Sequence, residues 1–259
     1  MKQTIVCLSV ISGLITSPSF AAASPSSKIL ESPALSSYSW LGRVSASLAF
    51  PITTNQFQTL ILLDGVNGDS TYQRQRNTKL NGSIGVSLGT ELPLISKVLI
   101  STWQPTLSYY QGLFNINGIL SQRLGAVIQG YDYEYVVDAS QVMFDNKVLI
   151  TGTNKYHPYG SVGLGASFNL ARAYRAHPLD QTFARSPVFS NNRTSAFSYS
   201  LGLGLDIDYS SNLAFGLGYR YVDYGLVSLN TSPVQNTSAK LKLNNLTTNQ
   251  LIAELTVRL

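Results

Sequence analysis

The sequence offers few side chains that could perform catalysis. It contains two histidines and one cysteine among 259 residues. His177 precedes Asp180 by three positions, a spacing that could mimic the Asp–His pair of a hydrolase. His157 abuts Pro158 beside a short connection, and no phosphate loop, dinucleotide fingerprint, HExxH motif or calcium loop occurs. The sequence therefore predicts no catalytic residue, no cofactor-binding residue and no metal ligand.

A second group of candidates consists of charged residues on the polar faces of alternating segments. Its members are Arg43, Glu91, Asp145, Lys147, Asp206, Arg220, Glu254 and Arg258. If these faces enclose an interior, the charges must pair, because an unpaired buried charge is costly. The favoured interpretation is a structural ion-pair network that fills a closed interior. The alternative is a charged gate or a narrow polar passage, and the pairing cannot be derived without the strand register.

A third group is basic and lies mostly in the longer connections between these segments. It comprises Arg74, Arg76, Arg172, Arg175, Arg185, Arg193, Lys240 and Lys242. Arginine binds phosphate as a bidentate donor, so these residues could contact lipopolysaccharide. The other interpretation is an ordinary solvated surface. The charges are dispersed along the chain, which gives no support for nucleic acid as a partner.

Period-two alternation of apolar residues marks the elements that must position these groups. The alternating segments are residues 39–50, 80–92, 97–111, 135–150, 158–168, 196–208, 213–221 and 250–259. One face of each is apolar, and the other carries mostly Gly, Ser, Thr, Asn and the charges above. Only 12% of the residues are charged, against about 25% in soluble domains. A soluble β-sandwich would place many Lys and Glu on its polar face, so we predict a transmembrane barrel.

The lengths of the connections alternate between short and long. The short connections are residues 93–96, 151–155 and 209–212, and the long ones are 51–78, 112–129, 171–194 and 229–239. Short turns at one rim and long loops at the other are typical of outer-membrane barrels. We therefore expect an all-β, eight-stranded antiparallel transmembrane barrel with short periplasmic turns and long extracellular loops. Residues 59–63 could add a hairpin, which leaves ten strands open.

Aromatic residues of the alternating segments are candidates for the girdles at the two membrane interfaces. They are Trp40, Tyr109, Tyr159, Tyr199, Tyr219, Tyr221 and Tyr224. Strand propensity alone is the other explanation for any one of them.

The N-terminus has the pattern of an export signal. Lys2 precedes an apolar stretch at residues 4–15, and small residues follow at a small-x-small cleavage site. We expect residues 1–23 to be a cleaved signal peptide, 24–38 a short periplasmic segment and 39–259 the barrel. Cys7 leaves with the signal peptide, so the mature chain has no thiol.

Residues 195–225 resemble the strand–turn–strand core of small Gram-negative outer-membrane barrels of the OmpA-like, opacity and surface-antigen type. The matching positions are Gly216, Gly218, Tyr219, Arg220, Tyr221, Asp223 and Gly225. Residues 156–171 are similar to a strand of a surface-barrel subfamily of intracellular gammaproteobacterial pathogens. Residues 250–259 look like the C-terminal strand read by the barrel-assembly machinery, with Leu259 where Phe is usual.

The resemblance implies an outer-membrane location, contact with lipid and lipopolysaccharide, and assembly through the C-terminal strand. It does not imply a single activity. The expected function is structural or surface-interacting, without catalysis, with loops that meet lipopolysaccharide or a host surface. The alternative is a small porin for ions or small solutes, lined by Arg43, Arg220 and Arg258.

Overall fold

The computed structural model describes residues 38–52, 57–61, 68–75, 81–94, 100–150, 155–180, 188–232 and 239–259. The chain divides into the units Met1–Leu35 and Ser36–Leu259, and only the second contains described residues. The expected signal peptide, Cys7, residues 24–37, Arg76 and Arg185 therefore lie outside the described part. Among the described residues, no helix is long and apolar enough to cross a membrane.

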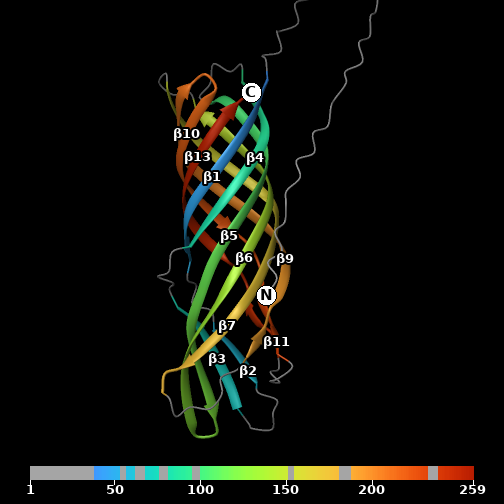
Figure 1. Cartoon of the computed structure of the whole chain (residues 1–259), viewed down its shortest axis with the longest axis vertical. Helices are drawn as coiled ribbons and strands as arrows, with labels where there is room; N and C mark the ends of the chain where they lie inside the picture. Colours follow the sequence, from blue (N-terminus) through green and yellow to red (C-terminus); the bar gives the residue numbers. More distant parts are fainter. Residues whose placement is uncertain are drawn as a thin grey trace, which may run out of the picture. The chain divides into compact units, whose positions relative to one another are not determined.

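Eight antiparallel strands of this unit close into a ring (Figure 1). They are β1(Ser39–Pro51), β4(Asn81–Pro93), β5(Ile100–Leu124), β6(Val127–Ile150), β7(Tyr156–Pro178), β9(Asn192–Ser210), β10(Leu213–Asp223) and β13(Thr247–Arg258). The order is β5-β4-β1-β13-β10-β9-β7-β6, and pairing of β5 with β6 completes the ring. The first and last strands meet in register Leu41↔Arg258. The predicted eight-stranded barrel is confirmed.

The two faces of the ring strands follow the predicted alternation. On the outer face, Val44, Leu88 and Leu203 are 59%, 72% and 64% exposed. The interior positions beside them are polar and buried, as at Ser45 and Ser87. Apolar residues outside and polar residues inside are the reverse of a soluble fold, and such an arrangement is stable when the outer face contacts lipid.

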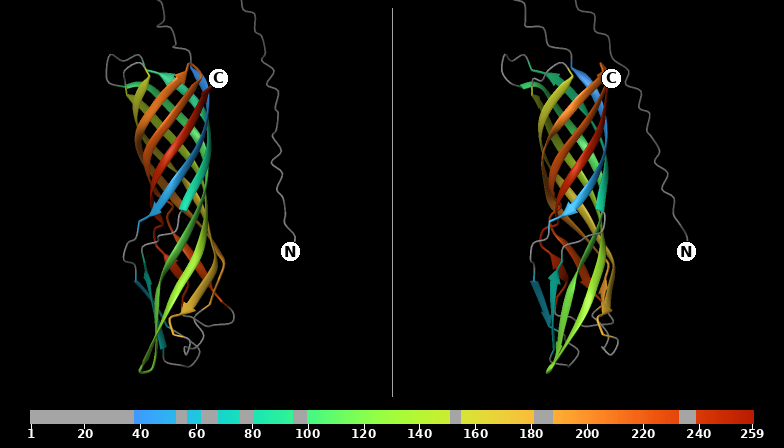
Figure 2. Two further views of the ribbon diagram at one scale, coloured as in Figure 1. Left: turned by 60° about the vertical axis from the view of Figure 1, so that its left-hand side comes forward. Right: turned by 90° about the vertical axis from the view of Figure 1, so that its left-hand side faces the viewer.

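The two rims of the ring differ. Ser39, Leu259 and the Ser211–Asn212 turn between β9 and β10 lie at one rim, which we call the turn rim. The four long connections leave from the opposite rim. There β5, β6 and β7, which have 25, 24 and 23 residues, continue past the ends of their shorter neighbours (Figure 2).

The long connections contain paired strands where loops were expected. β2(Phe57–Ile61) and β3(Gly68–Arg74) form a hairpin, and β3 pairs with the distal part of β5. The hairpin expected around residues 59–63 therefore forms, but outside the ring, which keeps eight strands. β5 and β6 run to a two-residue turn at residues 125–126, where Gly125 has a φ of 61°. The interpretation of 112–129 as a long loop is wrong.

A second, three-stranded sheet joins this region. It consists of β8(Phe189–Ser190), β11(Val227–Thr231) and β12(Leu241–Leu243). Gln58 of the hairpin links it to β2, since its side chain donates to the Lys240 carbonyl and accepts from the Lys242 amide. We call β2, β3, β8, β11, β12 and residues 114–137 and 171–178 the extension.

The extension has an apolar core of the kind found in soluble domains. Tyr72 packs edge-on against Tyr133 and Phe189, with ring centroids 5.5 and 5.8 Å apart. Leu120 and Tyr131 have no exposed surface. From Trp103 through Leu113 the exposed apolar residues of β5 occupy odd positions, and from Phe114 onward its buried apolar residues occupy even positions. This change of face marks where the surroundings change from lipid to water.

Candidate functional site

Lys147 lies at the centre of an ion-pair network inside the barrel. Its Nζ is 2.7 Å from Asp206 Oδ1 and 2.7 Å from Glu254 Oε2, and the residue is only 1% exposed. The ammonium also lies 3.7 Å from the ring centroid of Tyr159. Lys147 therefore neutralises carboxylates from β9 and β13 while it projects from β6, so one side chain connects three strands.

Two arginines extend the network around the interior. Arg43 Nε lies 3.8 Å from Glu254, and Arg43 Nη2 donates to Gln104 Oε1 at 2.6 Å. Arg220 lies 3.9 Å from Asp145 and stacks over Tyr110 at 4.0 Å from the ring centroid. Three cations, Arg43, Lys147 and Arg220, thus face Asp145, Asp206 and Glu254, so this part of the interior is balanced in charge.

A smaller group of charges lies near the turn rim. Arg258 Nε donates to Glu91 at 2.9 Å, and its Nη1 atom lies 3.0 Å from Asp208. The Asp208 carboxylate is also hydrogen-bonded to His157 Nε2, 3.1 Å away. The structure thus places all eight predicted interior charges inside the barrel. Their direct contacts form three groups: Lys147 with Asp206, Glu254 and Arg43; Arg220 with Asp145; and Arg258 with Glu91. Gln104 bridges the first and third groups, since it contacts both Arg43 and Glu91.

Sequence reasoning missed several members of this network. Asp208 follows Asp206 by two positions, so strand alternation would have placed both on one face. Tyr110 was not singled out, although its hydroxyl donates to Asp145 at 2.8 Å. Tyr159 and Tyr224 were expected at the membrane interfaces, and both are buried. Those two assignments are wrong, because the ring of Tyr159 covers Lys147 and that of Tyr224 packs against Phe114.

Glycines make the space that Tyr159 occupies. A Cβ on Gly218 would lie 2.3 Å from the Tyr159 hydroxyl, and one on Gly204 would lie 2.6 Å from the same ring. The Gly-x-Gly runs at mid-strand thus admit a large ring to a narrow interior. The cavity bordered by Arg43, Tyr110, Lys147 and Glu254 measures about 20 Å³, room for about one water molecule.

The basic residues of the third group occupy different environments. Arg172, Arg175, Arg193, Lys240 and Lys242 are exposed in the extension or at its base, and Arg172 pairs with Asp138. Arg74 does not share this exposure, because β3 turns it inward and only 5% of it is exposed. The prediction that Arg74 contacts lipopolysaccharide at the surface is therefore wrong.

The histidine considered for hydrolysis lies near the end of β7. His177 is exposed and stands opposite Asp132 in the β6–β7 register. Among the described residues, no three His, Cys, Asp or Glu side chains gather as they would around a metal ion.

No family model matches the chain, and no curated protein matches it in sequence. Solved structures similar to it include Neisserial surface protein A, 12% identical, with a TM-score of 0.41 over 86% of this chain and 99% of that one. OprG from Pseudomonas aeruginosa is 14% identical, with a TM-score of 0.39 over 85% and 95%. The outer membrane protease OmpT from Escherichia coli is 8% identical, with a TM-score of 0.42 over 85% and 97%.

The closed ring, the apolar outer face and the polar interior define the class of protein. Only a closed barrel satisfies every backbone group of strands that cross lipid. The chain is an eight-stranded β-barrel of the Gram-negative outer membrane. In that topology the turn rim is periplasmic and the extension is extracellular.

Proposed function

We propose that the chain is a structural and surface-interaction protein, without catalysis, whose barrel anchors a folded extracellular extension. The observation that carries this proposal is the filled interior. Lys147, Asp206 and Glu254 satisfy one another across the barrel, and the cavity beside them is about 20 Å³. A barrel of this kind holds the extension at the cell surface, where lipopolysaccharide or a host surface is within reach.

The alternative porin function requires a continuous polar path, and the paired charges occupy that path. We therefore expect the refolded protein in a planar bilayer to give no steady single-channel openings. Tyr159→Ala removes the ring over Lys147. If any variant conducts ions in the same bilayer experiment, we expect it to be this one. Steady wild-type openings whose conductance changes in Arg220→Gln would overturn the closed-barrel proposal in favour of the porin.

The exposed basic residues of the extension and its base support lipopolysaccharide as the first partner, and a host surface as the second. Arg175 and Arg193 project from neighbouring strands β7 and β9. Each removed charge should weaken binding of lipopolysaccharide to the protein in lipid nanodiscs by about two- to five-fold. Arg175→Gln and Arg193→Gln test this, with Lys155→Gln at the periplasmic turn as the matched control. Unchanged affinity in both variants would contradict the contact.

The last strand supports a partnership with the barrel-assembly machinery. β13 closes the ring against β1, and the Leu259 amide donates to the Trp40 carbonyl at 2.8 Å. If the machinery reads this strand, Leu259→Asp should lower the amount of assembled protein in cells while refolding in detergent is unchanged. Equal losses of assembled protein in cells and of refolded protein in detergent would mean that Leu259 affects only the stability of the barrel.

A further inference from the structure

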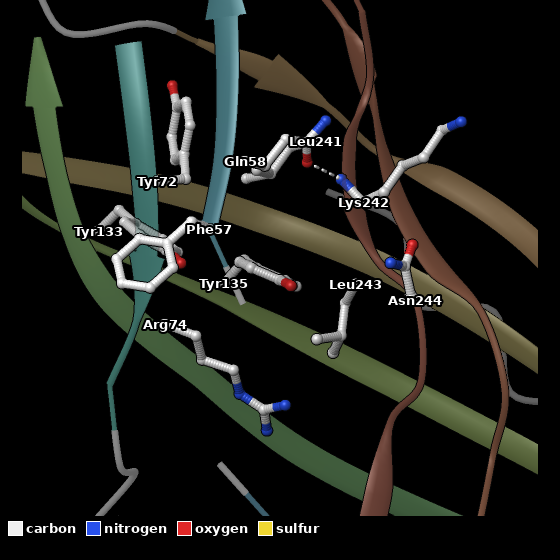
Figure 3. Close-up of a pocket in the computed structure, with 10 residues that line it drawn as sticks. All are labelled: Phe57, Gln58, Tyr72, Arg74, Tyr133, Tyr135, Leu241, Lys242, Leu243 and Asn244. Atoms are coloured by element: carbon white, nitrogen blue, oxygen red, sulfur yellow. Dashed lines mark hydrogen bonds between the residues drawn. The ribbon is translucent and has the colours of Figure 1, made fainter. Parts of the chain in front are cut away.

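The extension contains a pocket that the proposed surface contact does not use. It lies between the β2–β3 hairpin, β6 and residues 241–244, and its volume is about 430 Å³ (Figure 3). Tyr135 and Leu243 project toward each other across it, and Arg74 lies alongside them. A volume of this size matches pockets that hold small molecules, which run from roughly 300 to 1,000 Å³.

The pocket is a built feature of the fold. The two hydrogen bonds of Gln58 to the backbone at Lys240 and Lys242 fix β12 against β2 at distances of 2.8 and 2.7 Å. On the opposite wall, Arg74 pairs in register with Gly118. A Cβ on Gly118 would lie 2.6 Å from the Tyr133 hydroxyl, so this glycine leaves the space in which Tyr133 stands beside Arg74.

Arg74 is a buried charge for which the described residues supply no counter-ion. It is 5% exposed, and within the described part of the chain its Nη1 atom has no hydrogen-bond partner. The groups that act on it electrostatically are the hydroxyls of Tyr133 and Tyr135, and burial lowers the pKa of the guanidinium. An arginine stays charged nonetheless, so this site gains most from an anion that completes the pairing.

The walls of the pocket indicate what the anion is attached to. Phe57, Tyr72, Tyr133 and Tyr135 present aromatic surface, while Gln58 and Asn244 add polar groups. Neither Asp nor Glu lines the pocket among the described residues. Lys242 also lines the pocket, but its ammonium points away from the other lining side chains (Figure 3). The one buried positive charge, that of Arg74, matches one negative charge, and a planar carboxylate accepts two parallel N–H bonds from a guanidinium. Aromatic walls favour a flat ring over a flexible acyl chain, because rings pack against rings.

We propose that this pocket binds a small organic carboxylate, with the carboxylate paired to Arg74 and a ring-bearing body packed among the aromatic side chains. The site is separate from the exposed arginines that support lipopolysaccharide contact. Binding at the pocket therefore does not depend on the proposed surface function, and an experiment can contradict one proposal without contradicting the other.

The test uses the full chain refolded in lipid nanodiscs and two fluorescent probes, 2-naphthoate and the uncharged 2-naphthamide. Empty nanodiscs supply the background. We expect naphthoate to bind at least about ten-fold more tightly than the amide, because hydrogen bonds between charged partners are about twice as strong as neutral ones. Arg74→Gln should abolish that preference. Arg123→Gln, which removes an exposed charge near the hairpin tip, should leave it unchanged.

Equal binding of the acid and the amide, or an unchanged preference in Arg74→Gln, would overturn the proposal. Leu243→Trp covers the case in which Arg74→Gln does not fold. It fills the pocket while Arg74 is retained, so both probes should lose at least about ten-fold in affinity. Unchanged naphthoate binding in a folded Leu243→Trp protein would place the probe elsewhere and overturn the proposal. Lipopolysaccharide binding, measured on the same samples, reports on the surface contact separately.

Discussion

Lys147 and Arg74 are both buried cations, but they differ in their partners. Lys147 has two carboxylates at 2.7 Å, whereas Nη1 of Arg74 has no partner among the described residues. Removal of one member of a buried ion pair leaves its partners unsatisfied, whereas removal of an unpaired buried charge relieves a desolvation cost. The two positions should therefore respond to neutral substitution in opposite directions.

Lys147→Met should destabilise the barrel by about 3–5 kcal/mol, since Asp206 and Glu254 would remain buried beside each other. Urea unfolding in lipid vesicles measures the change. Adding Glu254→Gln to the variant should recover part of the loss. Arg172→Gln breaks an exposed ion pair with Asp138 and is the control, with an expected cost below about 1 kcal/mol. Similar losses in both single variants would rule out the special role of the interior network.

Arg74→Met should stabilise the extension, or leave it unchanged, while naphthoate binding is lost. Replacement of even a buried ion pair by apolar side chains is often neutral or stabilising by about 1–4 kcal/mol, and an unpaired charge has no Coulomb attraction to lose. Hydrogen exchange of the β3 and β6 amides measures the local stability of the extension. Faster exchange in the variant would mean that Arg74 supports the fold, and the pocket would then be a by-product of packing.

At the scale of elements, β5 and β6 each belong to two environments. Within the membrane their apolar side chains point outward, as at Leu107 and Phe144, and in the extension they point inward, as at Leu120 and Tyr133. Pairing of β5 with β6 is continuous from Thr102↔Leu149 to Leu124↔Val127, so the ladder crosses this boundary without a break. The extension is thus connected to the barrel by backbone ladders, which positions its pocket relative to the rim.

Leu120→Ala should unfold or loosen the extension and leave the barrel intact. Truncation of a buried leucine costs about 2–5 kcal/mol. Hydrogen exchange should quicken at residues 114–124 and 127–137, while amides of β1 and β13 keep their protection. Ile128→Ala, at an exposed position of the same hairpin, is the control. Rapid exchange of residues 114–124 in the wild-type protein would contradict the paired extension.

At the scale of the whole molecule, closure of the ring decides whether the chain is stable in lipid. β1 and β13 are separated by most of the sequence, yet they pair along eleven residues from Leu41↔Arg258 to Pro51↔Thr248. Closure at this seam leaves no strand edge exposed to lipid, where each unsatisfied backbone group would cost several kcal/mol.

Ala46→Pro should prevent closure, because proline lacks the N–H that a strand between two neighbours donates. Ala46 lies opposite Ala253 of β13 and Ile84 of β4. The wild-type barrel is expected to migrate faster on a detergent gel before boiling than after it. Ala46→Pro should lose the fast form, whereas Ser211→Pro, in the turn between β9 and β10, should retain it. A normal fast form in Ala46→Pro would show that the seam is dispensable.

The sequence by itself determined the eight membrane strands and the face of each, but not that the segment 112–129 continues two of these strands to a two-residue turn. These follow from a period of two, which is a local property of the chain. The apolar residues of β5 also change face between Leu113 and Phe114, and this change in the sequence indicates where the strand leaves the membrane.

Only the tertiary structure decided which charges meet, and that Tyr159 and Arg74 point inward. Arg43 and Thr256 are 213 residues apart in sequence and hydrogen-bonded at 3.2 Å. Alternation assigns a side chain to a face but carries no information on register between strands, and register sets every contact across the barrel. For the same reason the pocket around Arg74 emerged only when β2, β3, β6 and β12 were brought together.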